Sequence, residues 1–248
     1  MHIPRFFSTE PPLVEEPWQL PAAAGHHAVR VLRLTPGCAV QVFDGSGRQF
    51  SGTVSAIERD RCWVSLGRPD WPAVESPLPV ILGQGLAASD KFDLVLQKAV
   101  ELGVAAVHPL ALRRSLIKLD AERAERRHQH WLGVLTAACE QCGRVRIPAL
   151  GPVQGLADWL AGLPADALRL RLAPEGPAHM AGLAPPPAGV ILVVGPEGGF
   201  DPDETRQLEG AGFQGVRLGP RVLRTETAAL AAIAALQAWH GDFRPSPL

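Results

Sequence analysis

Two glycine-rich segments in the last quarter of the chain contain the residues best suited to holding a small ligand. The first, Gly195–Phe200 (GPEGGF), directly follows the branched apolar run Val190–Val194. Glycines in such a turn tolerate positive φ and let backbone N–H groups approach a ligand closely. The second, Leu218–Ala228, combines Gly-Pro with two arginines and leads into an apolar helical stretch. Together the two segments could enclose a small molecule.

Neither segment has the signature of a nucleotide-phosphate site. Gly195–Phe200 lacks the GxGxxG spacing of dinucleotide-binding folds, and no Lys-Ser or Lys-Thr pair follows it as in a P-loop. A dehydrogenase is therefore disfavoured. Asp201, Pro202 and Glu204 predict a helix start with an N-cap, a proline at the first helical position and a reciprocal cap. Taken alone, this segment could equally be a tight turn that only begins a helix.

The cysteine pair Cys139 and Cys142 suggests a metal or redox site, but its surroundings argue against one. No second CxxC is present, and the histidines nearby precede the pair on the same expected helix. His128 and Cys139 are eleven residues apart, which on a helix is about 16 Å. One ion with bonds of about 2 Å cannot reach both. We expect no metal, and cysteines that are free thiols.

A basic stretch in the middle of the chain could bind an anionic partner. Arg113–Arg146 contains eight lysines and arginines against four acids, whereas the whole chain has a net charge of −1. RNA would suit such a stretch, although a solvated helix face with internal ion pairs explains the charges equally well. Arg144, near the end of an expected helix, could hold a phosphate or a base.

The elements that must position these residues fall into two regions. The sequence predicts short strands at residues 39–43, 49–54 and 62–66, joined by Asp/Gly turns. This pattern favours a small barrel or curled sheet. A short helix is expected within His26–Leu34, and the proline-rich segment Arg68–Pro79 is the best linker. We therefore place one domain at residues 1–72 and a second at residues 73–248.

In the second region, apolar runs alternate with amphipathic stretches, which predicts an α/β domain with a mostly parallel sheet. The expected strands lie at 80–82, 106–110, near 147, at 168–172 and at 190–194. The helix from about 89 carries the apolar stripe Phe92, Val95, Leu96, Ala99 and Val100. Further helices are expected at about 120–142, with the inward stripe Ala121, Ala124, Trp131, Leu135 and Ala138, at 156–160 and at 228–239.

Length and hydropathy limit the class of protein. No apolar run approaches the roughly 20 residues that span a bilayer, and the N-terminus lacks the apolar core of a secretion signal. A chain of 248 residues can bury most of its apolar surface without disulfides. We expect a soluble cytoplasmic protein that does not associate with membranes.

The two glycine-rich segments, GPEGGF and LGPRVLRTETA, resemble those of the SPOUT-class RNA methyltransferases. The similarity is strongest to the family that methylates N3 of a uridine in 16S ribosomal RNA. It continues through nearly the whole chain, in RFF, HHAVRVLRL, FDGSG, KAVELGV, RRS and EQCGR at Arg5–Phe7, His26–Leu34, Phe43–Gly47, Lys98–Val104, Arg113–Ser115 and Glu140–Arg144.

This resemblance implies a small N-terminal PUA-like β-barrel that binds RNA and a C-terminal α/β domain tied in a trefoil knot. It implies S-adenosylmethionine as cofactor, 16S ribosomal RNA or the small ribosomal subunit as partner, and a homodimer. Carried over position by position, the cofactor residues would be Leu172, Ala173, Pro174, Gly195, Pro196, Glu197, Gly198, Gly199, Leu218, Gly219, Leu223, Thr227 and Ala228.

For catalysis, uridine N3 must lose its proton, or the resulting anion must be stabilised. Arg224 could supply the positive charge, and Glu197 or Glu226 could accept the proton or hold Arg224; Glu197 could also only cap its own turn. The RNA contacts implied by the resemblance are Arg5, Arg30, Arg33, Arg114 and Arg144. A methyltransferase of another RNA position and a non-catalytic dimeric RNA-binding protein remain alternatives.

The helix expected at Ala228–Trp239 predicts the dimer. Its larger apolar residues Leu230, Ile233, Leu236 and Trp239 recur every three positions, and alanines fill much of the rest. A terminal helix with so little polar surface would leave an apolar patch on a monomer. We expect a two-fold homodimer that buries part of this helix. The alternative is that the helix packs only on its own sheet.

Overall fold

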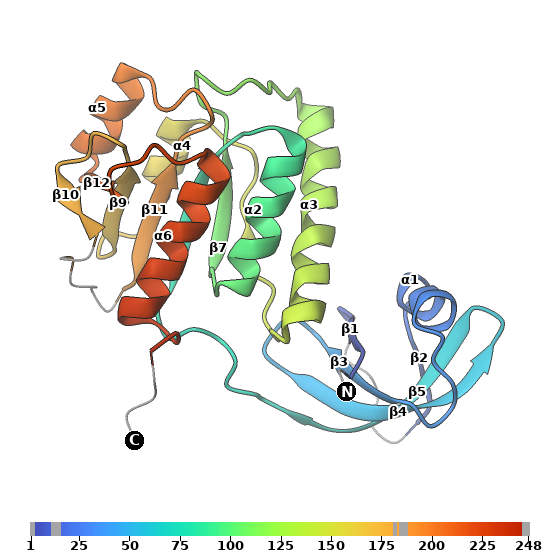
Figure 1. The fold of residues 1–248 in the computed structure, drawn as a ribbon. Helices are drawn as coiled ribbons and strands as arrows, with labels where there is room; N and C mark the ends of the chain where they lie inside the picture. Colours follow the sequence, from blue (N-terminus) through green and yellow to red (C-terminus); the bar gives the residue numbers. More distant parts are fainter. Residues whose placement is uncertain (1–2, 11–15, 181–182, 184–187, 245–248) are drawn as a thin grey trace. The chain divides into compact units, whose positions relative to one another are not determined.

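The computed structural model describes residues 3–10, 16–180, 183 and 188–244 (Figure 1). Its contacts divide the chain into two compact units. The first comprises Met1–Glu75 together with Thr136–Ile147, and the second comprises Ser76–Leu135 together with Pro148–Leu248. The segment Thr136–Ile147 comes from the middle of the chain, so the first unit is not a continuous stretch of sequence.

The first unit is built on a five-stranded sheet in the order β1-β3-β4-β5-β2. The pairing of β1 with β3 is parallel, and the other pairings are antiparallel. Register shifts in the β4–β5 pairing mark bulges, which bend and twist long strands. The curled sheet expected from the Asp/Gly turns is therefore confirmed. The strands are β1 (Arg5–Phe7), β2 (Trp18–Gln19), β3 (Ala39–Phe43), β4 (Gln49–Glu58) and β5 (Arg61–Asp70).

Two details of the first unit differ from the expectation. Strand β5 continues to Asp70 because Pro69 and Asp70 pair with Phe50 and Gln49, so the linker begins later than Arg68. The helix expected within His26–Leu34 starts earlier, as α1 (Ala22–His26), and continues as the π-helical turn η1 (His27–Val31). Its buried face packs on the sheet core through Ala28.

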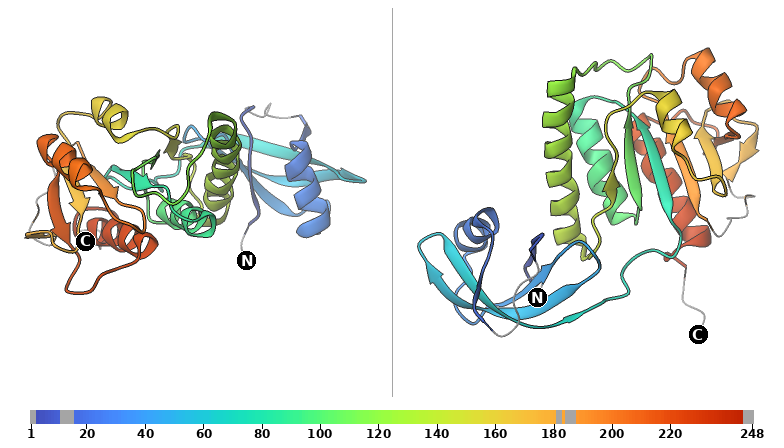
Figure 2. Two further views of the ribbon diagram at one scale, coloured as in Figure 1. Left: turned by 90° about the horizontal axis from the view of Figure 1, so that it is seen from above. Right: turned by 180° about the vertical axis from the view of Figure 1, so that it is seen from behind.

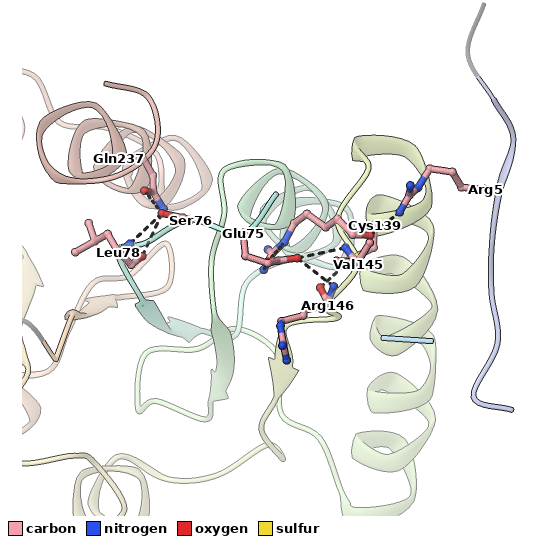
Figure 3. A network of polar contacts seen from close by, with 9 residues as sticks. Arg5, Glu75, Ser76, Leu78, Cys139, Val145, Arg146 and Gln237 are labelled. Carbon is pink, nitrogen blue, oxygen red and sulfur yellow. Dashed lines mark hydrogen bonds and ion pairs between the residues drawn. The ribbon is translucent and has the colours of Figure 1, made fainter. Parts of the chain in front are cut away.

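The segment Thr136–Ile147 is tied to the first unit by polar contacts (Figure 3). Glu75 accepts hydrogen bonds from the Arg144 side chain at 2.9 and 2.6 Å and from the backbone amides of Val145 and Arg146 at 3.2 and 3.1 Å. The amide of Phe7 donates to Glu140 at 2.9 Å. These contacts join residues that are more than sixty positions apart in the sequence.

The second unit contains a seven-stranded sheet in the order β10-β12-β9-β11-β6-β7-β8, and all its pairings are parallel. All five residues of the central strand β11 are buried, as expected of a continuous apolar run. The parallel α/β architecture is therefore confirmed. The strands are β6 (Val80–Gly85), β7 (Ala106–Leu110), β8 (Ala149–Leu150), β9 (Leu168–Leu172), β10 (Ala178–His179), β11 (Val190–Val194) and β12 (Gln214–Arg217).

Helices cover both faces of this sheet (Figure 2). Trp159 and Leu208, from α4 (Leu156–Ala161) and α5 (Pro202–Gly210), pack with Ile191 and Val193 on one face. Helices α2 (Ser89–Glu101) and α6 (Thr225–His240) lie side by side on the other face. The stripe predicted for α2 is buried throughout.

Helix α3 (Ala121–Cys142) matches the predicted 120–142 helix in extent. Trp131, Leu135 and Ala138 of its predicted stripe are buried. Ala121 is exposed and Ala124 is only half-buried, because the first turns of the helix run along the solvent. Among the residues that the structure describes, no helix has the length and apolar character needed to cross a membrane.

Candidate functional site

A cavity of about 790 Å³ opens in the second unit where β9, β11 and β12 end. The three strands are neighbours in a parallel sheet, so the loops that follow them meet at one edge (Figure 1). This edge is where open α/β sheets bind ligands, and the volume suits a small organic molecule. The cavity therefore lies where the two glycine-rich segments were expected to meet.

Most of the residues assigned to the cofactor from the sequence line this cavity. They are Leu172, Ala173, Pro174, Gly195, Pro196, Glu197, Gly199, Leu218, Gly219, Leu223 and Ala228. Gly198 and Thr227 do not line it. A Cβ at Gly198 would lie 3.0 Å from Cβ of Arg114, so this glycine permits a close approach of Arg114 to the loop. Thr227 lies on the exposed side of α6.

The loop after β11 folds as its sequence predicts. The amide of Gly199 donates to the carbonyl of Pro196 at 2.8 Å, and Gly199 has a φ of 68°. The predicted capping box is present: Asp201 accepts from the amide of Asp203, and the Glu204 carboxylate accepts from the amide of Asp201 at 2.8 Å. The helix start thus fixes the loop that forms one wall of the cavity.

The loop after β12 is joined to the loop after β11 by Thr225, the first residue of α6. Its hydroxyl donates to the carbonyl of Gly195 at 2.6 Å and accepts from the buried amide of Gln84 at 2.9 Å. The sequence pattern predicts a start of this helix at Ala228, so it places neither Thr225 nor Gln84 at the site. The one sequence signal for Thr225 is its place between Arg224 and Glu226. A threonine followed by a glutamate is typical of many helix starts and does not indicate a ligand site.

Glu197, expected in catalysis, is held by its neighbours. Its carboxylate accepts from Lys91 Nζ at 3.0 Å and from the amide of Ala88 at 3.3 Å. Burial by itself raises the pKa of Glu197, but hydrogen bonds from its own amide, from Lys91 and from Ala88 outweigh burial and hold the pKa below its usual range. Glu197 is therefore ionised near neutral pH and is a weak proton acceptor.

Arg224 occupies the N-cap position of α6, and its exposed side chain lines the cavity. Its guanidinium forms no hydrogen bond or ion pair with any residue that the structure describes, Glu197 and Glu226 included. Glu226 does not line the cavity, and one of its carboxylate oxygens is buried without a hydrogen-bond partner in the described chain. Of the expected catalytic residues, Arg224 alone presents an available charge to the cavity.

Two arginines assigned to RNA, half-buried Arg5 and buried Arg144, form polar contacts within the first unit. Arg144 is 8% exposed and paired with Glu75. Arg5 donates hydrogen bonds to Gln41, to Gln49 and to the carbonyl of Arg144 (Figure 3). Its guanidinium also lies 5.1 Å from the centre of the Phe43 ring. Both guanidiniums therefore have partners that hold the fold together.

The other three arginines assigned to RNA are exposed. Arg30 pairs with Asp60 at 2.5 Å. Arg33 has a φ of 53° at the turn that follows η1, and its guanidinium has no partner in the described part of the chain. Arg114 lines the cavity and donates to the carbonyl of Gly198 at 3.2 Å. The structure thus separates these exposed arginines from Arg5 and Arg144, which the sequence pattern cannot do.

The cavity offers bare backbone and apolar side chains to a ligand. Gly199 and Gly219 both have positive φ, and a Cβ at either position would meet no atom within 4 Å, so bare backbone faces open space. Half-buried Leu218 and Leu223 supply apolar surface. The described residues contain no group of three histidines, cysteines or acids able to hold a metal. The site therefore suits an organic ligand held by backbone and apolar contacts.

Comparison with known protein families agrees with this architecture. A family model described as an RNA methyltransferase domain matches residues 74–237, and a model described as an RNA methyltransferase PUA domain matches residues 20–67. The first match covers more than half of the chain. The chain belongs to this RNA methyltransferase family.

Several relatives of this RNA methyltransferase are named ribosomal RNA small subunit methyltransferase E. The protein of that name from Mycobacterium bovis is 36% identical over 86% of this chain and 82% of its own length. A solved structure of that name from Neisseria gonorrhoeae, bound to S-adenosylmethionine, is 36% identical, has a TM-score of 0.91 and covers 98% of this chain and 100% of its own.

A putative methyltransferase from Legionella pneumophila, solved in complex with S-adenosylmethionine, is also similar. It is 34% identical, with a TM-score of 0.92, and the match covers 98% of this chain and 100% of that one. Both structures resemble this chain over its whole length, so the two-region architecture is common to all three.

Proposed function

We propose that this RNA methyltransferase transfers a methyl group from S-adenosylmethionine to N3 of a uridine in the 16S ribosomal RNA of the small subunit. The cavity formed by three loops at one edge of a parallel sheet carries this proposal. Two similar solved proteins were crystallised with S-adenosylmethionine, and relatives are named as small-subunit ribosomal RNA methyltransferases. The trefoil knot and action in the cytoplasm are expected with this function.

The loops around the cavity would hold S-adenosylmethionine mainly through backbone and apolar contacts. Backbone amides and carbonyls of Gly195–Gly199 and Leu218–Leu223 can hydrogen-bond an adenine edge, and Leu218 and Leu223 can cover its faces. Such a ligand has no phosphate, which explains a glycine-rich loop without the P-loop lysine. When bound, S-adenosylmethionine supplies a methyl group on a positively charged sulfur.

In the proposed reaction, N3 of the uridine would bond to the methyl group supplied by the bound cofactor, S-adenosylhomocysteine would be left as the second product, and the N3 proton would pass to solvent water. The chain itself must stabilise the uridine as N3 loses that proton. The negative charge that develops on O2 or O4 of the base would be stabilised by Arg224, whose guanidinium lines the cavity without a partner among the described residues. Glu197 would act differently from the expectation. Because it is ionised and hydrogen-bonded to Lys91, we assign it to holding Lys91 and the loop after β11 in place.

RNA phosphates would be met by the exposed arginines, and not by Arg5 and Arg144, whose guanidiniums are held within the first unit. Arg114 lies at the cavity, and Arg30 and Arg33 belong to the first unit, where a match to an RNA methyltransferase PUA domain supports RNA binding. Arg5 and Arg144 would support this surface from within, since their guanidiniums already have protein partners.

The substrate position can be tested in ribosomal RNA from a strain that lacks the gene. Mass mapping of nuclease fragments should show one uridine in 16S ribosomal RNA without its N3 methyl group. Purified protein and S-adenosylmethionine should restore that methyl group in vitro. Restoration at another position would change the substrate, and failure to bind S-adenosylmethionine in calorimetry would favour a non-catalytic RNA-binding protein.

We propose a homodimer, with a different contact face from the one expected. Of the four larger apolar residues expected at the contact, Ile233 and Leu236 are buried in the chain's own core and cannot contact a second copy, whereas Leu230 is half-buried and Trp239 is 37% exposed. The opposite side of α6 carries Thr227, Ala231, Ala234 and Ala238, which are half-buried or exposed and recur at helical spacing. Small side chains let a second helix approach closely, so this face is the better candidate.

The substitution Ala234→Arg tests this face. Light scattering of the wild-type protein should give twice the chain mass of 26.5 kDa, and the variant should give the chain mass because a guanidinium cannot be buried in an alanine contact. Ala121→Arg, at an exposed position of α3, should leave the mass of the wild-type assembly unchanged. A wild-type monomer that methylates RNA would contradict the proposed dimer.

A further inference from the structure

One of the cations that line the cavity is buried, whereas the others are not. Arg171 is 6% exposed. The remaining cationic side chains at the cavity are half-buried or exposed, and they are Lys91, Arg114, Arg217, Arg221 and Arg224. The alternation of arginine and leucine in Leu168–Leu172 is the only sign of this residue in the sequence.

The fold makes room for the Arg171 guanidinium inside the sheet. Strand β9 lies between β11 and β12, and Arg171 pairs in register with Val193 and Gly215 (Figure 1). A Cβ at Gly215 would lie 3.2 Å from Nη2 of Arg171, so glycine at this position leaves space for the charged group. The arginine therefore occupies a built niche at the end of β9.

The hydrogen-bonding capacity of Arg171 is only partly used. Nη1 lies 3.2 Å from Glu175 and Nη2 lies 3.3 Å from Glu209, while Nε is buried without a hydrogen-bond partner in the described chain. The side chains of Glu175 and Glu209 are 72% and 55% exposed. Ion pairs with such solvated carboxylates are weak, whereas burial removes the guanidinium from water. An anion inside the cavity would complete its pairing.

The chemistry of this pair identifies the group that would bind there. Arg171 and Glu175 both line the cavity and carry opposite charges. An α-amino acid end presents a carboxylate and an ammonium one carbon apart, so it can satisfy both residues at once. A backbone phosphate of RNA belongs to a large polymer and is better matched by the exposed arginines.

We propose that Arg171 binds the carboxylate, and Glu175 the ammonium group, of the amino-acid end of S-adenosylmethionine. This inference rests on the proposed function and assigns a subsite within it. The ligand inserts between the two side chains, so each charge exchanges a weak protein contact for a contact with the ligand. Because both residues border the Leu172–Pro174 loop, ligand binding would also order that wall of the cavity.

The test compares two ligands that differ only at this end. S-adenosylhomocysteine carries the amino-acid end, and 5′-methylthioadenosine is the corresponding thioether without it. In calorimetry, Arg171→Gln should lower the affinity for S-adenosylhomocysteine by about tenfold or more, as expected for the loss of a charge-assisted pair. The same variant should bind 5′-methylthioadenosine as the wild type does. Glu175→Gln should show the same selectivity with a smaller loss.

Arg169→Gln is the matched control. Arg169 lies two residues earlier on the same strand, contacts the carbonyls of Ala211 and Pro164, and does not line the cavity. Its substitution should leave the ratio of the two affinities unchanged. If Arg171→Gln does not fold, Arg171→Lys and Glu175→Gln give the same comparison.

Two results would overturn the assignment. If Arg171→Gln lowers the affinity for both ligands equally, Arg171 only supports the loop. If the affinity for both ligands is unchanged, Arg171 has no part in the subsite. A wild-type protein that binds neither ligand would instead refute the proposed function, and this inference with it.

Discussion

Replacing Arg224 by alanine is expected to lower kcat by about 100- to 1,000-fold, the range found when one group that stabilises a developing anion is removed. The guanidinium lines the cavity, is exposed and has no partner among the described residues, so its charge is available to the substrate base. Affinity for S-adenosylmethionine should stay near the wild-type value because that ligand contacts the loops mainly through backbone and apolar groups. Single-turnover methylation and calorimetry measure the two quantities separately.

Two further variants make this test specific. Arg224→Lys keeps a positive charge and should recover part of the lost rate. Arg206→Ala removes a positive charge from the exposed surface of α5, where Arg206 pairs with Asp203 and does not line the cavity. That control should methylate RNA at nearly the wild-type rate. A similar loss in Arg206→Ala, or an unchanged rate in Arg224→Ala, would remove Arg224 from the mechanism.

Glu75→Gln is expected to lower the free energy of unfolding by about 3 kcal/mol, the cost of leaving the buried guanidinium of Arg144 without its charged partner. The Arg144 side chain is 9% exposed, and Glu75 also accepts from the amides of Val145 and Arg146. Neutral glutamine keeps the shape but loses the charge. Urea denaturation followed by tryptophan fluorescence measures the change.

The control for this prediction is Glu122→Gln. Glu122 pairs with Arg126 on the surface of α3, where the two side chains are 80% and 66% exposed. Such pairs contribute at most about 1 kcal/mol. Equal destabilisation by the two substitutions would show that burial of Arg144 adds nothing to the pair with Glu75.

Local patterns in the sequence were enough to find part of the secondary structure around the site, but not strand β12 or the first turn of α6. The branched run Val190–Val194 is the buried central strand, and Asp201 with Glu204 forms the predicted capping box. The five-residue stripe of α2 is buried as its helical spacing indicates. These features depend on residues within a few positions of one another, so the chain itself specifies them before any long-range contact forms.

The arginines show where sequence alone is insufficient. Arg33 is exposed and Arg144 is buried, yet both stand in basic stretches that look alike in the sequence. The difference arises from Glu75, which is 69 positions away from Arg144. The role of a long charged side chain depends on whether folding brings an opposite charge next to it. A single sequence does not give the distance in space between two such residues.

The sequence determined some features of the site, and the tertiary structure determined the others. Glycine-rich loops after buried strands indicated from the sequence where a ligand would bind. The tertiary structure alone joined Thr225 to Gly195 and Gln84, and turned Arg171 into the cavity. Parallel strands that are neighbours in the sheet are distant in the chain, because each crossover inserts a helix or loop between them. Which side chains meet at their ends is therefore decided by strand order.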